Sequence, residues 1–291
     1  MGATAQQAAF RLLAAGEFDE GIAELGKDPN WEDEDLSLDG RFYLGFPCAP
    51  GWGEGLLIAS LLKRHAAASG EVIEAFADPR LRDVLADDPM FRVTPVENFD
   101  QCRDLGGRSP LAVLRHALIG DLLNQRFVPI NGPTIAAASP EHRVGIAWAS
   151  LKKSGKAKIP GKWMPLDVLL DLTSLDASHV VSFQRDITPE DRNRLRLRCG
   201  EKCTILDDTK IHAAEIGRLA RMITISTTTA HIAASFGVAT VLLAARRDGP
   251  QWFWQAQEEH RKILYPTVRV ILGGRGAEWW RELPHDLADS M

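Results

Sequence analysis

The sequence has little of the chemistry that marks secreted, membrane-spanning or disulfide-rich proteins. It contains four cysteines and two tyrosines in 291 residues. No stretch approaches the roughly 18 consecutive apolar residues of a transmembrane helix. The start of the chain also lacks the basic segment and apolar run of a secretory signal peptide. We therefore expect a soluble, cytoplasmic protein with no membrane span.

An excess of positive charge is also missing. The chain has 34 Lys and Arg against 39 Asp and Glu, a formal net charge of −5, and an isoelectric point near 5.9. Proteins that grip nucleic-acid phosphates need a concentrated positive field, so nucleic acid is not an expected partner. With 45% hydrophobic and 25% charged residues, the composition is that of a globular protein, and at roughly 150 residues per domain the length predicts two domains.

The few cysteines do not form a typical metal motif. Cys48 and Cys102 stand alone, whereas Cys199 and Cys203 have three residues between them rather than the two of a common zinc knuckle. Reduced thiols with a packing role are favoured over ligands. No metal and no cofactor are expected.

The order of sequence patterns predicts an α/β protein. Residues 1–38 form a helical hairpin and linker that is similar to the end of a tetratricopeptide repeat, and this hairpin is either a protein-docking surface or a plain helical cap. Residues 39–140 and 141–291 each alternate short apolar strands with amphipathic helices, which is typical of parallel sheets built from βαβ units. We therefore expect two Rossmann-like domains with a break near Pro140 and a cleft between them. In such sheets ligands bind beyond the carboxyl ends of the strands, at helix N-termini.

A glycine-rich turn with one carboxylate precedes the first long helix. Gly51, Gly53 and Gly55 allow close approach of a ligand to the backbone, and Glu54 lies between them. Beside a bound hydroxyl this carboxylate could act as a general base. The alternative is a tight turn whose glutamate favours the helix dipole. The turn lacks the glycine spacing of the dinucleotide fingerprint, which disfavours an NAD-dependent dehydrogenase.

A second turn is rich in hydroxyl groups and opens another helix. Ser226, Thr227, Thr228 and Thr229 follow a short strand, and His231 comes one turn into the helix. Hydroxyls and amides at a helix N-terminus can bind a diphosphate, and the imidazole could donate to a phosphate oxygen. The alternative is an ordinary helix cap with a packed histidine.

Two further groups could contribute to a donor site. Lys158 and Lys162 lie in a lysine-rich loop and could meet phosphate charge, although such loops are usually just solvated. Aromatic and amide side chains could line a sugar or base pocket, with core packing as the alternative. These pocket candidates are Trp148, Gln184, Trp252 and Trp254.

In this order, the segments GWGEGLLIASLL, VGIAWAS, VVSFQ, ITISTTTAHIAASFGVATVLL, WFW and LYPTVRV resemble bacterial glycosyltransferases of the GT-B fold that follow tetratricopeptide repeats. That family looks related to the ADP-heptose:lipopolysaccharide heptosyltransferases and, more distantly, to O-linked N-acetylglucosamine transferases. The resemblance covers the chain from about Phe18 to its end.

The resemblance implies inverting, metal-independent transfer of a sugar from a nucleotide-diphosphate donor to a protein or glycan acceptor. It assigns the base to Glu54, which falls where the family commonly has Gly-Asp. It assigns diphosphate binding to the 226–229 turn with His231, and to Lys158 or Lys162. Many relatives carry Asp-Thr where Ser226-Thr227 stands, so a nucleotide-sugar-binding or scaffold protein without turnover is the alternative.

Overall fold

In the computed structural model, the chain forms two compact units. The structure describes residues 5–31, 35, 37–47, 52–132, 143–151, 158–173, 175, 179–200, 203–206, 213–246 and 251–284. Unit 1 comprises Met1–Thr134, Ser235–Gly237 and Asp248–Pro266, and unit 2 comprises Ile135–Ala234, Val238–Arg247 and Thr267–Met291. The expected domain break near Pro140 lies outside the described residues.

Unit 1 is built around a small parallel sheet of order β1-β2-β3. Its strands are β1 (Phe42–Tyr43), β2 (Ile73–Ala77) and β3 (Phe91–Pro95). Its longer helices are α1 (Ala5–Ala15), α2 (Phe18–Leu25), α3 (Trp52–Ser69), α4 (Pro79–Leu85), α5 (Phe99–Asp104), α6 (Leu111–Leu118) and α11 (Trp252–Glu258), with a short 3-10 turn, η1 (Leu122–Asn124). Helix α3 is buried along most of its length, so it is the central element of this unit.

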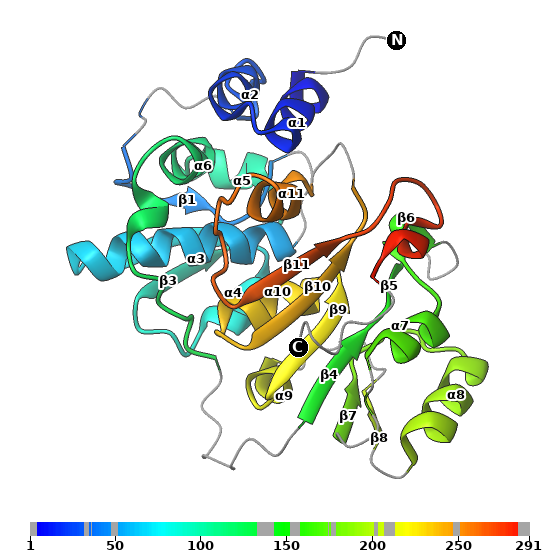
Figure 1. Ribbon diagram of the computed structural model, residues 1–291. Coiled ribbons are helices and arrows are strands. Elements are labelled where there is room, and N and C mark those ends of the chain that lie inside the picture. Colours follow the sequence, from blue (N-terminus) through cyan, green and yellow to red (C-terminus); the bar gives the residue numbers. More distant parts are fainter. Residues whose placement is uncertain are drawn as a thin grey trace. The chain divides into compact units, whose positions relative to one another are not determined.

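The expected N-terminal helical hairpin is present as α1 and α2 (Figure 1). Its apolar face is buried, including Phe10, Leu13 and Leu25. The hairpin contacts α11, and just after that helix Nε2 of His260 lies 3.1 Å from the Ala14 carbonyl oxygen, with its ring edge-on to the Phe18 ring. The apolar stripe of the hairpin is therefore used for packing within unit 1.

The sequence carries no sign that residues 248–266 leave the C-terminal half to pack in unit 1. These residues carry α11 and then return to the last strand of unit 2. Trp252, Phe253 and Trp254 are all buried, and the rings of Trp254 and Tyr265 lie 6.1 Å apart. A local pattern marks this segment as apolar, but only the tertiary fold decides which core it enters.

Unit 2 contains a six-stranded, wholly parallel sheet of order β11-β10-β9-β4-β7-β8 (Figure 1). Its strands are β4 (Arg143–Ala147), β7 (His179–Ser182), β8 (Cys203–Ile205), β9 (Arg221–Ile225), β10 (Ala239–Ala244) and β11 (Val268–Leu272). Its helices are α7 (Leu166–Thr173), α8 (Pro189–Cys199), α9 (Ala213–Gly217) and α10 (Thr228–Ser235), with a short 3-10 turn, η3 (Trp279–Glu282).

Alternate residues of the central strands face the cores on the two sides of this sheet. Ile146, Ile223 and Leu243 join the apolar core that also takes in α7 and Leu195 of α8. In Figure 1, α7 and α8 lie on one side of the sheet and α9 and α10 on the other. This is the doubly wound arrangement that alternating strands and helices predict.

The stretch expected to be a lysine-rich loop forms part of a hairpin. β5 (Ala149–Leu151) pairs antiparallel with β6 (Lys158–Trp163), with Ala149 opposite Trp163. Residues 152–157 lie outside the described part of the chain. The hairpin follows β4 directly, so its second strand returns Lys162 to the carboxyl edge of the sheet.

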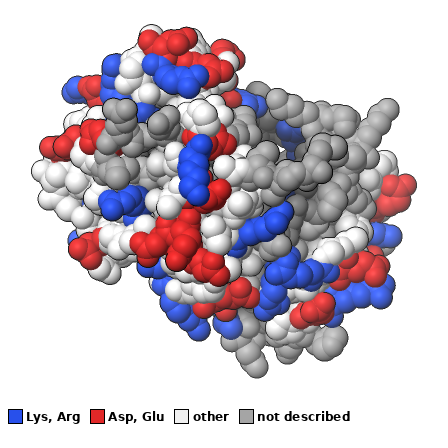
Figure 2. All heavy atoms as spheres, turned by 90° about the horizontal axis from the view of Figure 1, so that it is seen from above, with Lys and Arg blue, Asp and Glu red and all other residues white. Residues whose placement is uncertain are grey.

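The described residues also show the length of the helices, the surface charge and the state of the cysteines. None of the described helices is long and apolar enough to cross a membrane. Acidic and basic side chains are interspersed on the face shown in Figure 2. The three described cysteines are free thiols, and burial raises the pKa of Cys102 to about 12.

Candidate functional site

The order of strands in unit 2 creates one topological switch point. From β4 the chain proceeds to β7 and β8 on one side, whereas β9, β10 and β11 extend the sheet on the other. β4 and β9 are neighbours, with Ala147 opposite Thr224 near their carboxyl ends. Open α/β sheets bind ligands at such a point because the loops after the two strands diverge and leave a crevice. The 226–229 turn follows β9 at this position.

Thr224 and Thr227 hold the turn after β9 in place. The Thr224 hydroxyl lies 3.1 Å from the Ala147 carbonyl oxygen and 3.4 Å from the Thr227 hydroxyl. The Thr227 hydroxyl accepts a hydrogen bond from the Ala230 amide at 3.3 Å, which caps α10. Thr228 and Thr229 are half-buried in the first turn of the helix, where backbone N–H groups have no acceptor within the helix. Both the capping role and an anion-binding role are compatible with this geometry.

His231 senses the positive charge of Lys162 within unit 2, although 69 positions separate the two residues in the sequence. Burial, and to a lesser extent the positive charge of Lys162, lower the pKa of His231 to about 3. The imidazole is therefore neutral at physiological pH and keeps one N–H donor and one acceptor nitrogen. Lys162 supplies the positive charge. A neutral donor beside a cation at a helix N-terminus is suited to a phosphate oxygen.

The lowered pKa of His231 makes the stability of unit 2 depend on pH. The unfolded chain protonates this imidazole below the ordinary histidine pKa of 6.5, whereas the folded chain does so only near 3. Stability contributed by the neutral imidazole is therefore fully present above pH 6.5 and is lost as the pH falls. We expect the free energy of unfolding to fall by about 2 kcal/mol more in the wild type than in His231→Gln between pH 7.5 and 5. Urea titrations at the two pH values measure this difference.

A packing change on the same helix is the control for this pH experiment. Ile232→Val shortens a buried side chain of α10, so it should lower stability by roughly 0.5–1.5 kcal/mol at both pH values alike. Equal pH dependence of the wild type and His231→Gln would contradict the assignment of a neutral, buried imidazole.

Gln184 and Trp148 are buried residues at the edge of the switch point, and Gln184 holds the backbone there by hydrogen bonds. The Gln184 side-chain oxygen accepts hydrogen bonds from the amides of Trp148 at 3.0 Å and Ala149 at 2.8 Å. Its amide nitrogen donates to the carbonyl oxygens of Ala149 and Arg185. Trp148 is buried in the core of unit 2. Gln184 thus fixes the point where β4 passes into the lysine-bearing hairpin.

The glycine-rich segment of unit 1 is helical from Trp52 onward. Gly53, Glu54 and Gly55 therefore lie in the first turn of α3 rather than in a loop before it, and Gly51 lies outside the described residues. A Cβ at Gly55 would approach the Leu44 carbonyl oxygen to 2.7 Å. This glycine is required by the close packing of α3 against the end of β1. The Arg80 guanidinium lies over the Trp52 ring at 3.5 Å and helps to fix the start of the helix.

Glu54 is buried in unit 1, where its charge acts on Tyr265. Only 8% of the residue is exposed. Burial, with a further contribution from the negative charge of Glu54, raises the pKa of Tyr265 above its usual range, so this phenol stays protonated. Burial also lowers the pKa of Arg64 to about 10, and its guanidinium donates to the Leu264 carbonyl oxygen at 2.7 Å. Glu54 thus belongs to a polar group inside unit 1 that includes the returning segment 248–266.

The remaining aromatic candidates lie in cores. Trp252 and Trp254 are at most 1% exposed, and the rings of Trp254 and Phe253 lie 4.9 Å apart. This is the core-packing arrangement that the sequence left open as the alternative for these residues. Lys158 begins β6, and its side chain lies outside the described part of the structure.

Known proteins resemble this chain in structure, but the comparisons of its sequence found no match. No protein-family model matches the chain, and no curated protein matches it. A solved structure of the E. coli heptosyltransferase WaaC with ADP has a TM-score of 0.53 at 10% identity, over 84% of this chain and 96% of that one. A glycosyl transferase family 9 protein from Veillonella parvula has a TM-score of 0.51 at 13% identity, over 81% of this chain and 86% of that one.

These similarities concern the fold. The chain has the α/β architecture of GT-B-like glycosyltransferases, with a parallel sheet in each unit. At such low identity, substrates do not transfer from one protein to another on the fold alone. The function of this chain therefore has to be inferred from the residues at the switch point.

Proposed function

We propose that this protein is a glycosyltransferase that moves a sugar from a nucleotide-diphosphate donor to a protein or glycan acceptor. The observation that carries the proposal is the hydroxyl-rich first turn of α10 at the switch point of a doubly wound sheet, where buried His231 senses the charge of Lys162. In this proposal the diphosphate accepts hydrogen bonds from the amides and hydroxyls of the 226–229 turn and from His231. Lys162 offsets its charge.

In the transfer step, the Glu54 carboxylate takes the proton from an acceptor hydroxyl as its oxygen attacks the anomeric carbon. The bond between that carbon and the donor diphosphate breaks, and the diphosphate leaves with the electron pair. Attack from the face opposite the leaving group inverts the configuration of the sugar. Lys162 and the N-terminus of α10 stabilise the growing negative charge, so this mechanism requires no metal ion.

The donor site is tested by binding before an acceptor is known. The probes are ADP, GDP, UDP, CMP and their sugar conjugates, each in a thermal-shift measurement. We expect one nucleotide diphosphate to stabilise the protein, by about 2.7 kcal/mol at 100 times its dissociation constant. Lys162→Ala should weaken that binding by roughly tenfold or more, because hydrogen bonds to charged groups contribute about 1.5–3 kcal/mol.

Arg194→Ala is a matched control for Lys162→Ala. It removes one half-exposed cation from α8 of the same unit and changes the net charge equally, so it should leave nucleotide affinity unchanged. Equal loss in both variants would mean that only general electrostatic attraction is involved. No shift with any nucleotide in a folded protein would overturn the donor site.

The second candidate function is a nucleotide-sugar-binding or scaffold protein without turnover. The burial of Glu54 beside Tyr265 favours it, because a base must reach an acceptor hydroxyl. This alternative predicts the same nucleotide shift but no sugar transfer to any acceptor. Incubation with the stabilising nucleotide sugar and a pool of glycan and protein acceptors separates the two functions.

A further inference from the structure

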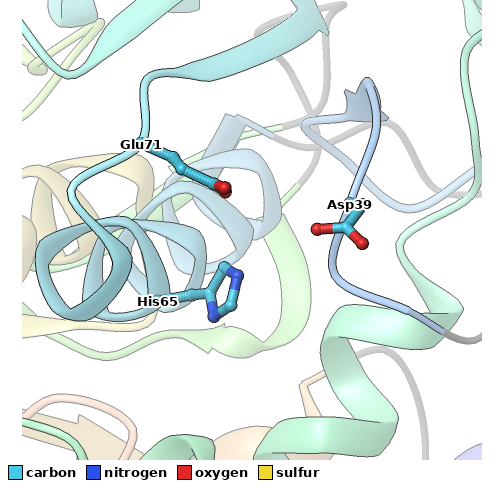
Figure 3. A group of neighbouring side chains, drawn as sticks. All are labelled: Asp39, His65 and Glu71. Atoms are coloured by element: carbon cyan, nitrogen blue, oxygen red, sulfur yellow. The ribbon is translucent and has the colours of Figure 1, made fainter.

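Three side chains that can bind a metal ion converge in unit 1. Asp39 precedes β1, His65 lies on α3, and Glu71 lies in the turn between α3 and β2. One ligand atom from each lies within 4.8 Å of the others, and Figure 3 shows the three side chains facing a common space. All three line a pocket of about 230 Å³. No single stretch of sequence holds this group, because Asp39 is 26 positions from His65.

The two carboxylates lack a cationic partner within the part of unit 1 that the structure describes. There, the ion pairs and side-chain hydrogen bonds include none from the side chains of Asp39, His65 or Glu71. Two negative charges held close together repel one another, and a positive charge between them offsets this repulsion. A divalent cation bound to both carboxylates and a neutral imidazole would balance the charge of the group.

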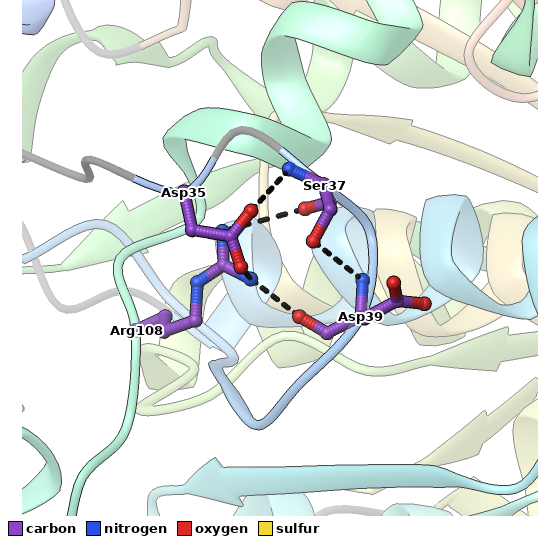
Figure 4. A network of polar contacts seen from close by, with 4 residues as sticks. All are labelled: Asp35, Ser37, Asp39 and Arg108. Atoms are coloured by element: carbon purple, nitrogen blue, oxygen red, sulfur yellow. Dashed lines mark hydrogen bonds and ion pairs between the residues drawn. The ribbon is translucent and has the colours of Figure 1, made fainter.

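The loop that carries Asp39 is fixed independently of any ion. The Arg108 guanidinium bonds the Asp35 carboxylate at 3.0 Å and the carbonyl oxygens of Ser37 and Asp39 (Figure 4). The Ser37 hydroxyl in turn accepts from the Asp39 amide at 3.3 Å. Arg108 therefore engages the backbone of Asp39, and Figure 4 shows the Asp39 carboxylate directed away from this network.

Gly40 allows this loop to turn next to Arg108. Its φ is +114°, a conformation that favours glycine, and a Cβ there would lie 3.3 Å from the Arg108 side chain. His65 is likewise held by the buried helix α3. Two of the three ligand positions thus have a fixed backbone before a metal binds, which lowers the entropic cost of binding.

We propose that Asp39, His65 and Glu71 form a binding site for a first-row divalent transition-metal ion of the Zn²⁺ class. One imidazole nitrogen and two carboxylate oxygens are ligands that suit Zn²⁺, whereas Mg²⁺ and Ca²⁺ prefer oxygen alone. Zinc–ligand bonds of about 2.0–2.2 Å place tetrahedral ligands roughly 3.4 Å apart. Rotation of the exposed Asp39 and Glu71 side chains supplies this contraction, and water from the pocket completes the coordination.

The ion ties the segment before β1 to the end of α3 and the start of β2. It is a structural clamp within unit 1 and takes no part in the proposed sugar transfer. The inference does not depend on the proposed function, because the ligands and the measurement concern unit 1 without nucleotide. Metal binding should raise the melting temperature, since a ligand that binds only the folded state stabilises it.

The test uses the untagged full chain after treatment with a chelator. Isothermal titration calorimetry with Zn²⁺ should give one site per chain that neither Mg²⁺ nor Ca²⁺ fills. Glu71→Gln and His65→Ala should each weaken Zn²⁺ binding at this site by about 100-fold or more, because even outer-sphere partners of a metal are worth about 10- to 100-fold. The two variants change different ligands, so a folding defect in one does not remove the test.

Glu74→Gln is the matched control, because it neutralises an exposed glutamate three positions away, on β2. It should bind Zn²⁺ as the wild type does. The proposal is overturned if the wild type binds no Zn²⁺, or if Glu71→Gln and His65→Ala both retain wild-type affinity. Loss in Glu74→Gln equal to that in Glu71→Gln would also overturn it, because the effect would then be one of surface charge.

Discussion

Asp88→Ala should lower the free energy of unfolding of unit 1 by about 3–5 kcal/mol, the range measured when one partner of a buried ion pair is removed. The Asp88 carboxylate is fully buried and pairs with Lys63, whose side chain is only 2% exposed. It also accepts hydrogen bonds from the amides of Asn131 at 2.7 Å and Met90 at 3.0 Å. The substitution would leave a buried ammonium group without its counter-charge.

This ion pair joins three segments that are distant in the sequence. Lys63 projects from α3 and also donates to the Pro129 carbonyl oxygen at 2.6 Å, while Asp88 lies in the turn before β3. Urea unfolding measures the loss of stability, and hydrogen exchange of the α3 amides assigns it to unit 1. A typical domain has only about 5–15 kcal/mol of stability, so the variant should be close to unfolding.

Asp83→Ala and a double variant are the controls for Asp88→Ala. Asp83 is 67% exposed, and its substitution should change stability by less than about 0.5 kcal/mol. Lys63→Met combined with Asp88→Asn removes both charges. The loss of stability in this double variant should be smaller than the summed losses of Lys63→Met and Asp88→Asn measured singly. Additive costs would contradict direct coupling between the two side chains.

Much of unit 2 could be predicted from its sequence because its strands are short apolar runs between helical patterns. The parallel, doubly wound sheet follows from that alternation. β11 gives a weaker signal, because this edge strand has exposed Arg269 between buried residues. The sequence pattern does not reveal β3 for the same reason, because only the first residue of this edge strand is buried. Edge strands lose the continuous apolar pattern because one side of them has no neighbour.

The candidate site was predictable only in part, for a different physical reason. Hydroxyls and a histidine at the start of a helix are visible in the sequence, and so is a loop with five lysines. Which of these lysines has its charge near His231 depends on the register of the β5-β6 hairpin, and the charge that lowers the pKa of His231 is that of Lys162. The group of Asp39, His65 and Glu71 has no local signal at all, because its members meet only when the chain folds.

Glu54→Gln should abolish most sugar transfer while leaving nucleotide binding intact. A positioned general base contributes about 10²–10⁴-fold to a reaction, and glutamine has nearly the same shape but cannot accept the proton. Because Glu54 belongs to unit 1 and the proposed diphosphate site to unit 2, the turnover number should fall and the donor dissociation constant should not.

Glu190→Gln separates this role from an effect on the helix dipole. Both glutamates lie in the first turn of a helix, but Glu190 of α8 is exposed whereas Glu54 of α3 is buried. Loss of a first-turn carboxylate alone costs typically 0.3–1 kcal/mol of helix stability, so roughly that effect and no change in turnover are expected for Glu190→Gln. Full activity of Glu54→Gln would remove Glu54 from the mechanism. A nucleotide shift without any transfer by the wild type would instead identify a binding protein that has kept the donor site of this fold.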